Sequence, residues 1–263
     1  MDVDRIRRIG TAAAYNAAKV LWSRFGNIDH VEKKGRIDLV TEADIAAEKA
    51  IVDTLRVGFP DVGILAEESG ASGDNGKGSW VIDPLDGTTN YAHRLGFFAV
   101  SLAFVVDGVP EVGIVLNPVS DELFCAVARQ GAWRNGNPIS VSSTKSMEDS
   151  LLVTGFPYNV RDILPETTQR FARVLNRSQG VRRLGSAALD LCYVADGRFE
   201  AFWEQNLKPW DTAAGWLMVA EAGGRVTDFS GGAYDLGCPE ILASNGSVHP
   251  DMQHLLTLEE DDS

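Results

Sequence analysis

The sequence has few of the residues that build disulfides or soft-metal sites. Its 263 residues contain four histidines and three cysteines, Cys125, Cys192 and Cys238. An odd number of widely spaced cysteines fits neither a disulfide framework nor a zinc site. Free cysteines of this kind are typical of proteins in a reducing compartment. We therefore expect a cytoplasmic protein, and any metal site in it should use oxygen ligands.

The sequence also has no long hydrophobic run. The longest one, residues 97–106, is interrupted by Ser101 and is too short to cross a bilayer. Residues 1–10 carry charges every few positions and lack an apolar stretch, so we expect no signal peptide and no membrane partner. Hydrophobic residues make up 44% of the chain, which is ordinary for a globular protein with a sizeable core.

Positive charge is scarce. The chain has 24 Lys and Arg against 37 Asp and Glu, a formal net charge of −13. Such a balance argues against nucleic-acid binding through overall charge, because phosphate backbones attract basic surfaces. A protein this acidic that binds a phosphate needs metal ions or local N–H groups to offset the repulsion.

The N-terminal half favours two helices and an antiparallel sheet. Apolar residues at steps of three and four predict a helix over residues 6–24. Thr41 followed by Asp44 fits a capping box that opens a second helix, to about residue 57. Alternating apolar runs joined by turns predict a meander over residues 97–129. The Gly- and Ser-rich residues 70–78 are expected to be a flexible surface loop.

The C-terminal half alternates strands with helices. Strands are expected at residues 151–154, 181–184, 199–203 and 240–243. Helices are expected at residues 166–176, 187–195, 210–222 and 248–258. Alternation of this kind predicts a layered α/β half, distinct from the meander half. We expect one catalytic domain over residues 1–263, with sub-halves of about 1–145 and 146–263.

Two aspartates flank a proline in the stretch that runs from Trp80 to His93. A buried strand should end at Pro84, so that Asp83 and Asp86 point to one spot. Residues 87–89 then start a short helix whose free N–H groups face the same spot. Carboxylates beside a helix N-terminus suit a phosphate with a metal next to it. The same pattern also fits an ordinary turn between a strand and a helix.

Other acids could complete such a site. Glu67 and Glu68 end a neighbouring strand, where they would point to opposite faces, so at most one should reach a shared site. Three converging carboxylates would bind a hard cation such as Mg²⁺. Asp44 and Asp211 each have a plain alternative as a helix cap. Lys33 could reach for an anion or simply be solvated.

Four motifs together make the chain resemble the inositol monophosphatase family, which belongs to the Mg²⁺-dependent, Li⁺-sensitive phosphatases. They occur in the family's order and cover most of the chain: Asp38-Leu-Val-Thr-x-x-Asp44, Ala66-Glu-Glu-Ser69, Trp80-x-x-Asp-Pro-x-Asp-Gly-Thr-Thr-Asn-Tyr-x-His93 and Trp210-Asp-x-Ala-Ala-Gly215. The resemblance implies an αβαβα layered sandwich of the α/β (α+β) class, with a mainly antiparallel N-terminal sheet. It also implies a homodimer that hydrolyses a sugar or polyol phosphate with two or three Mg²⁺ ions.

The resemblance assigns roles to individual residues. The implied metal ligands are Glu67, Asp83, the Leu85 carbonyl, Asp86 and Asp211. Thr88 and Asp44 match the pair that orients the attacking water, with Glu67 as a further catalytic residue. The implied substrate contacts are Gly87, Thr88, Ser186, Ala187, Glu204 and Asp211. Lys33 aligns with a loop lysine near the metals.

Departures from the family pattern affect substrate choice. Ser186 replaces a frequent threonine, and residues 205–209 differ from the animal enzymes. Inositol 1-phosphate is the first expected substrate, because the Gly-Thr-Thr-Asn-Tyr version of the central motif resembles inositol monophosphatases. Fructose 1,6-bisphosphate, histidinol phosphate and adenosine 3′,5′-bisphosphate remain alternatives. A non-catalytic regulatory role, for example as an RNA-polymerase-associated binding protein, is the alternative from another class.

Overall fold

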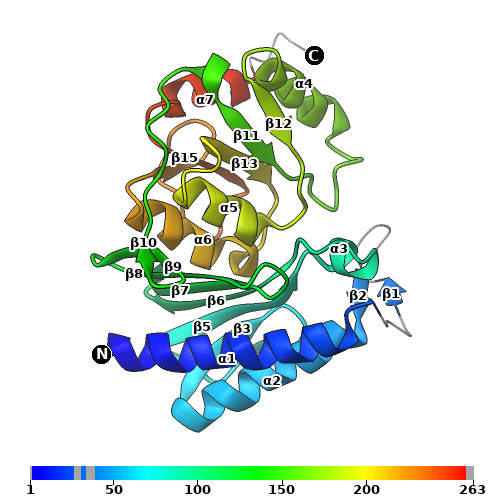
Figure 1. Cartoon of the computed structure of the whole chain (residues 1–263), viewed down its shortest axis with the longest axis vertical. Helices are drawn as coiled ribbons and strands as arrows, with labels where there is room; N and C mark the ends of the chain where they lie inside the picture. The colour runs from blue at the N-terminus through cyan, green and yellow to red at the C-terminus, as the bar shows by residue number, and fades with distance from the viewer. Residues whose placement is uncertain (1, 27–30, 34–38, 259–263) are drawn as a thin grey trace.

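The computed structural model describes residues 2–26, 31–33 and 39–258, and for a few of these only the backbone. Helices and sheets alternate in five layers, as Figure 1 shows from bottom to top. The α/β class and the αβαβα sandwich expected from the sequence are thereby confirmed. Within the described residues, no helix combines the length and apolar character needed to cross a membrane.

Seven α-helices occur in the described part of the chain. Their bounds are α1 Val3–Arg24, α2 Glu42–Gly58, α3 Thr88–Ala92, α4 Leu164–Leu175, α5 Ala187–Ala195, α6 Pro209–Glu221 and α7 His249–Leu256, with a 3-10 turn at Met147–Asp149. The first layer pairs α1 with α2, and their apolar faces pack under the large sheet (Figure 1). The predicted capping box of α2 is present, because Asp44 accepts from Thr41 N and Thr41 Oγ1 at 2.8 and 2.5 Å.

The large sheet has eight strands in the order β10-β9-β8-β7-β6-β5-β3-β4. Their bounds are β3 Val62–Ala66, β4 Gly70–Ser72, β5 Asp74–Asp86, β6 Ala99–Val106, β7 Val109–Asn117, β8 Glu122–Val127, β9 Gly131–Arg134 and β10 Asn137–Pro138. The predicted antiparallel meander is β6 to β9. β3 and β5 pair in parallel, with Ala66 opposite Ile82. Because parallel strands end at the same edge, this pairing brings the residues after Ala66 beside those after Ile82.

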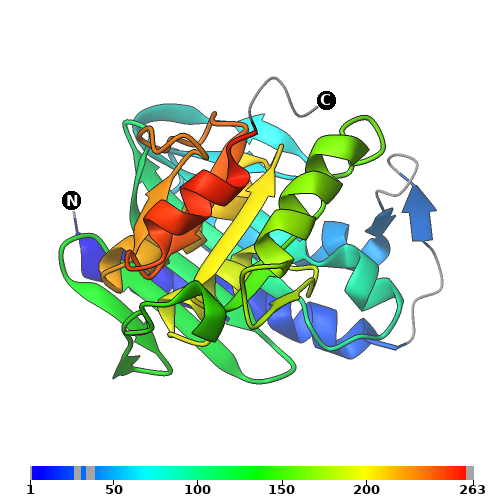
Figure 2. The ribbon, with the colours of Figure 1, turned by 90° about the horizontal axis from the view of Figure 1, so that it is seen from above.

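The upper sheet has five strands in the order β12-β11-β13-β15-β14. Their bounds are β11 Leu151–Thr154, β12 Gly180–Arg182, β13 Ala201–Gln205, β14 Arg225–Thr227 and β15 Glu240–Ser244, while β1 Val31–Lys33 and β2 Leu39–Thr41 form a separate pair. Helices α5 and α6 lie between the two sheets, and α4 and α7 cover the outer face (Figure 2). Gly215 lets α6 approach α5 closely, since a Cβ there would lie 2.5 Å from Leu191 Cδ1.

Several local predictions were wrong. Pro84 does not end β5, which continues to Asp86 through an irregularity between Asp83 and Asp86. Residues 70–78 are not simply a loop, because β4 and the start of β5 pair with β3. Glu67 and Glu68 follow β3 rather than lying on it.

Two predictions fall outside what the structure describes. Asp38, the first residue of the first motif, lies in residues that are not described. Lys33 is described only as backbone of β1, so its expected contact with an anion stays a prediction.

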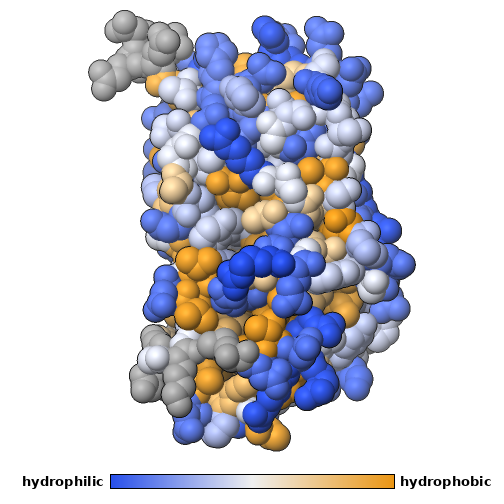
Figure 3. Space-filling view, turned by 90° about the vertical axis from the view of Figure 1, so that its left-hand side faces the viewer, coloured by the Kyte–Doolittle hydropathy of each residue, from blue (hydrophilic) through white to orange (hydrophobic). Residues whose placement is uncertain are grey.

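On the face shown in Figure 3, hydrophobic side chains form separate patches among hydrophilic ones.

Candidate active site

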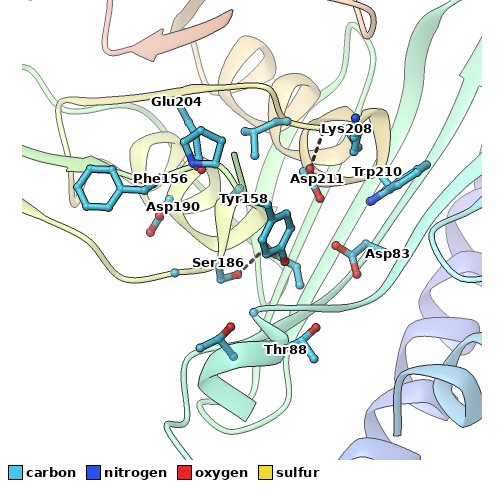
Figure 4. A pocket seen from close by; sticks show the side chains of 18 of the residues that line it. Asp83, Thr88, Phe156, Tyr158, Ser186, Asp190, Glu204, Lys208, Trp210 and Asp211 are labelled. Carbon is cyan, nitrogen blue, oxygen red and sulfur yellow. Dashed lines mark hydrogen bonds between the residues drawn. The ribbon is translucent and has the colours of Figure 1, made fainter. Parts of the chain in front are cut away.

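A cavity of about 260 Å³ opens between the large sheet and the layer of α5 and α6. Figure 4 shows Asp83 and Asp211 on one side of it, Asp190 and Glu204 on the other, and Tyr158 between them. The lining residues come from the large sheet and α3, from both middle helices and from loops of the upper half: Glu67, Asp83, Leu85, Asp86, Gly87, Thr88, Thr89, Gly155, Phe156, Pro157, Tyr158, Arg183, Gly185, Ser186, Ala187, Asp190, Glu204, Asn206, Leu207, Lys208, Trp210 and Asp211.

Four carboxylates meet at one end of this cavity, which we call the acidic end: Glu67, Asp83, Asp86 and Asp211. Asp83 and Asp86 are brought to it by the irregular end of β5, and Glu67 follows the neighbouring strand β3. The turn after β3 is fixed from below, because Glu48 of α2 accepts from Glu68 N and Ser69 N at 2.8 and 3.0 Å. A parallel strand pair thus aligns acids that lie sixteen residues apart in the sequence.

Hydrogen bonds orient the carboxylates of Asp83, Asp86 and Asp211. Asp83 Oδ1 accepts from Leu85 N at 2.9 Å. Asp86 Oδ2 accepts from Ser186 Oγ at 2.6 Å and from Ala188 N at 2.7 Å, which ties β5 to the start of α5. Asp211 Oδ2 accepts from Lys208 N at 2.6 Å (Figure 4).

Asp211 is therefore not the N-cap considered as its plain alternative. It is the third residue of α6, whose N-cap is Lys208. The hydrogen bonds to Asp83, Asp86 and Asp211 each hold one carboxylate oxygen in place.

The acidic end disfavours the charged form of its own acids. Burial raises the pKa of Asp83 well above its usual value, and the charges of Glu67, Asp86 and Asp211 raise it further. Burial raises the pKa of Asp86 to about 6, although Ser186 and the backbone of α5 oppose the shift. The pKa of Asp211 is raised by burial and by Asp86. Buried carboxylates that repel one another in this way need a cation to ionise together.

The donor set fits a hard divalent cation. The acidic end offers carboxylate oxygens and a backbone carbonyl at Leu85, which are the ligands that Mg²⁺ prefers. Within the residues that the structure describes, no three His, Cys, Asp or Glu side chains are already arranged to hold a metal ion. The fit therefore rests on the chemistry of the donors and on the mutual repulsion of their charges. The ligand roles of Glu67, Asp83, Asp86 and Asp211 stay predictions.

A chain of hydrogen bonds lies beside the acidic end. Gly87 takes a positive φ of 99°, which favours glycine, and is the N-cap of α3. Thr88 Oγ1 lies 3.1 Å from Asp44 Oδ1 and 3.1 Å from Leu85 O. Since Thr41 holds the other oxygen of Asp44, the carboxylate has a fixed orientation. The structure thus brings together the Thr88 and Asp44 pair that the sequence predicted, from α3 and α2.

The opposite side of the cavity, which we call the alcohol end, contains Ser186, Ala187, Asp190 and Glu204. Burial raises the pKa of Glu204 to about 8, and the charges of Asp211 and Asp86 contribute to the shift. Ser186, predicted to contact a polyol, is the N-cap of α5, and its hydroxyl donates a hydrogen bond to Asp86. Its predicted substrate contact stays a prediction.

Several residues in or beside the cavity were not predicted from the sequence. Asp190 is buried in α5, and its signal was a lone acid in an otherwise apolar helix. Arg183 lies 5.8 Å from the ring centroid of Phe156, at the alcohol end. Asn90 Nδ2 donates to Phe97 O and Leu184 O at 2.7 and 2.8 Å, which joins α3 to the segment before α5. Contacts between residues that lie far apart in the sequence, such as Asn90 and Leu184, leave no local pattern.

Comparisons with known proteins agree with this geometry. The profile of the "Inositol monophosphatase family" matches residues 2–260. An "Inositol-1-monophosphatase" from Synechocystis is 43% identical over 257 residues, which cover 97% of this chain and 90% of the relative. The "Nus factor SuhB" of Escherichia coli K12 is also 43% identical, over 91% of each chain.

Solved structures show the same similarity. The inositol monophosphatase from Anabaena superposes with a TM-score of 0.89 at 42% identity, over 97% of this chain and 96% of the other. The extragenic suppressor protein suhB from Bartonella henselae gives a TM-score of 0.92 at 38% identity, over 98% and 99%. A whole-chain profile match, relatives above 40% identity and a shared fold all point the same way. The chain belongs to the inositol monophosphatase family.

Proposed function

We propose that this protein is a Mg²⁺-dependent phosphate monoester hydrolase that acts on a sugar or polyol phosphate, with inositol 1-phosphate as the first candidate. The observation that carries the proposal is the acidic end, where Glu67, Asp83, Asp86 and Asp211 line one cavity and repel one another. Two or three Mg²⁺ ions would offset this repulsion and allow an anionic substrate to bind in a protein of net charge −13.

The chain's own residues would bind the metals and direct the water. Glu67, Asp83, Asp86 and Asp211, with the Leu85 carbonyl, would hold the Mg²⁺, which when bound acidifies water and stabilises a leaving alkoxide. Thr88 Oγ1, which donates to Asp44 Oδ1, would accept a proton from the attacking water while passing its own to that carboxylate. Burial raises the pKa of Asp44, which makes its carboxylate a stronger base.

The remaining contacts would hold the substrate. The backbone N–H groups of Gly87 and Thr88 would donate to the phosphate oxygens. The expected contacts to the alcohol are Ser186, Ala187 and Glu204, with Asp211 between the two ends of the cavity. These roles are carried over from the family resemblance and are supported by the position of each residue on the cavity wall.

A phosphate-release screen tests the proposal. The purified protein is incubated with Mg²⁺ and, separately, with inositol 1-phosphate, fructose 1,6-bisphosphate, histidinol phosphate and adenosine 3′,5′-bisphosphate. We expect release that depends on Mg²⁺ and is fastest with inositol 1-phosphate. Faster release from one of the other three substrates would replace the substrate assignment, and no release from any would contradict the hydrolase function.

A second candidate function is a binding role of the kind that the name Nus factor denotes. The observation that favours it is the 43% identity to the Escherichia coli protein of that name. Both functions can coexist on one chain, and Asp83→Asn separates them, because it should abolish hydrolysis without altering an outer surface. Co-purification of the unmodified and variant proteins with RNA polymerase tests the role. Equal capture would support it, and no capture of either would contradict it.

We also propose that the protein is a cytoplasmic homodimer. Large hydrophobic side chains on the surface support the dimer: Trp22, Ile45 and Leu95 are 56%, 60% and 57% exposed. Burying such side chains against a second copy would be favourable. Sedimentation equilibrium would give about twice the mass of 28.4 kDa for a dimer, and the monomer mass would contradict it.

A further inference from the structure

Asp190 is a buried acid at the alcohol end of the cavity, and none of the roles proposed above involves it. It lies in α5, one helical turn after Ser186, and is 1% exposed. It lines the cavity, and both of its carboxylate oxygens lack a hydrogen-bond partner among the described residues. A buried polar group without a partner costs on the order of 1–3 kcal/mol, so a carboxyl in this state calls for an explanation.

Two other buried acids show what a structural role looks like in this protein. Glu48 accepts from the backbone N–H groups of Glu68 and Ser69. Glu200 accepts from Ser142 Oγ at 2.8 Å and from Leu151 N at 2.7 Å. Each of these carboxylates has both oxygens bonded and fixes a loop or strand. Asp190 makes no such hydrogen bond to a loop or strand among the described residues, and unlike Glu48 and Glu200 it lies on the cavity wall.

The surroundings of Asp190 define the ligand chemistry that would satisfy it. Burial and the charges of Asp86 and Glu204 raise the pKa of Asp190, and Arg183 acts in the opposite direction. Figure 4 shows Asp190 on the same side of the cavity as Glu204 and Phe156, across from Asp83 and Asp211. Two acids with one guanidinium nearby disfavour a second anionic group. They suit hydroxyl groups, which donate to carboxylates and accept from arginine.

We propose that Asp190 is a specificity-determining residue that accepts a hydrogen bond from a hydroxyl group on the alcohol part of the substrate. It would act together with Glu204, so that two neighbouring hydroxyls of a polyol are read from two elements, α5 and β13. The proposal rests on the hydrolase function above and sharpens it. It assigns this cavity to an alcohol that carries several hydroxyls and only one phosphate.

The test compares two substrates on the same protein preparation. Inositol 1-phosphate carries hydroxyls beside the reacting phosphate, whereas 4-nitrophenyl phosphate has none. We expect Asp190→Ala to lower kcat/KM for inositol 1-phosphate by about 10-fold, mainly through KM, since a buried hydrogen bond to the substrate is lost. The value for 4-nitrophenyl phosphate should change less than twofold or so, because no contact to that alcohol is removed.

Two further variants guard against a trivial result. Asp190→Asn keeps the shape and an acceptor oxygen, so it should recover part of the loss seen with alanine. Glu200→Gln is the matched control, because it weakens a buried carboxylate that does not line the cavity. It should lower both activities equally if it lowers the folded fraction. The ratio of the kcat/KM values for the two substrates does not depend on the fraction of protein that is folded.

The outcomes separate this proposal from the function on which it rests. A selective loss for inositol 1-phosphate in Asp190→Ala, with partial recovery in Asp190→Asn, supports the proposal. An equal loss for both substrates, or no loss, overturns it and leaves the hydrolase function standing. If the unmodified protein releases phosphate from neither substrate, the hydrolase function and the proposal fail together.

Discussion

The two ends of the cavity are built in different ways. The acidic end takes Glu67, Asp83 and Asp86 from the ends of two neighbouring strands, and the large sheet holds them in place. The alcohol end takes Asp190 and Glu204 from α5 and β13, two elements of the upper half that contact each other. Three of the four acids at the acidic end therefore come from adjacent strand ends of the large sheet and Asp211 comes from α6, whereas both acids of the alcohol end come from the upper half.

This difference separates chemistry from specificity. We expect substitutions at the acidic end to affect every substrate alike, since each phosphate ester needs the same metal and water. Substitutions at the alcohol end should change the ranking of substrates. The predictions below test this contrast, beginning with the largest expected effect.

Asp83→Asn should give the largest loss of activity. Asp83 is buried in the acidic end, and its charge is needed to hold a cation. We expect kcat/KM to fall roughly 1000-fold for every phosphate ester, the scale of losing a preorganised electrostatic group. Phosphate release at saturating Mg²⁺ measures it. Asp228→Asn, at a half-buried loop acid that does not line the cavity, is the control and should keep full activity.

Thr88→Val should give the next largest effect. The change removes the hydroxyl that lies 3.1 Å from Asp44 Oδ1 while keeping the volume of the side chain. Loss of proton transfer should lower kcat by about 100-fold with little change in KM. Thr88→Ser keeps the hydroxyl and should retain most of the activity. Equal activity of the valine and serine variants would show that the hydroxyl has no part in the reaction.

Glu204→Gln should change specificity more than rate. Glu204 lies at the alcohol end and is 7% exposed. We expect KM for inositol 1-phosphate to rise by about 10-fold, the scale of one buried hydrogen bond. With 4-nitrophenyl phosphate the change should be small. If both substrates were affected equally, the two ends of the cavity would not differ in the way described above.

The smallest expected effect is the change of thermal stability with pH in the absence of divalent cations. Burial raises the pKa of Glu204 from 4.5 to about 8 in the folded state, so the folded protein holds a proton that the unfolded chain releases. The stabilisation is complete below about pH 4 and is lost as the pH rises toward 8. We expect the midpoint of thermal unfolding in EDTA to fall between pH 5 and pH 8, and to fall less in Glu204→Gln. Equal slopes for the two proteins would contradict the shift.

Local signals in the sequence predicted much of the scaffold and of the acidic end. The capping box of Thr41 and Asp44 needs only three residues of spacing, and α2 begins there as expected. The residues of α5 were predicted over their full length, because Ser186 caps the helix and an apolar run follows. Such signals depend on hydrogen bonds between near neighbours, so the sequence carries them directly.

The failures involve partners far away in the sequence. Residues 70–78 looked like a loop because their glycines and serines favour turns, yet β3 supplies an edge for them to pair with. The strand β14 was not predicted, since its pairing with β15 bridges more than ten residues. The position of Asp190 on the cavity wall was not predicted for a similar reason. Its helix was read correctly, but only the packed structure shows that this acid reaches the cavity.

Calorimetric titration with Mg²⁺ tests the central claim most directly, because it measures the cation itself rather than the reaction. The titration is made near pH 7 in two buffers of different ionisation enthalpy, with the unmodified protein and with Asp83→Asn. We predict that the unmodified protein binds Mg²⁺ and releases protons, since the raised pKa values of Asp83 and Asp211 leave protons to displace. The Asp83→Asn protein should bind far more weakly. Equal binding by both proteins would contradict the assignment of the acidic end as the metal site.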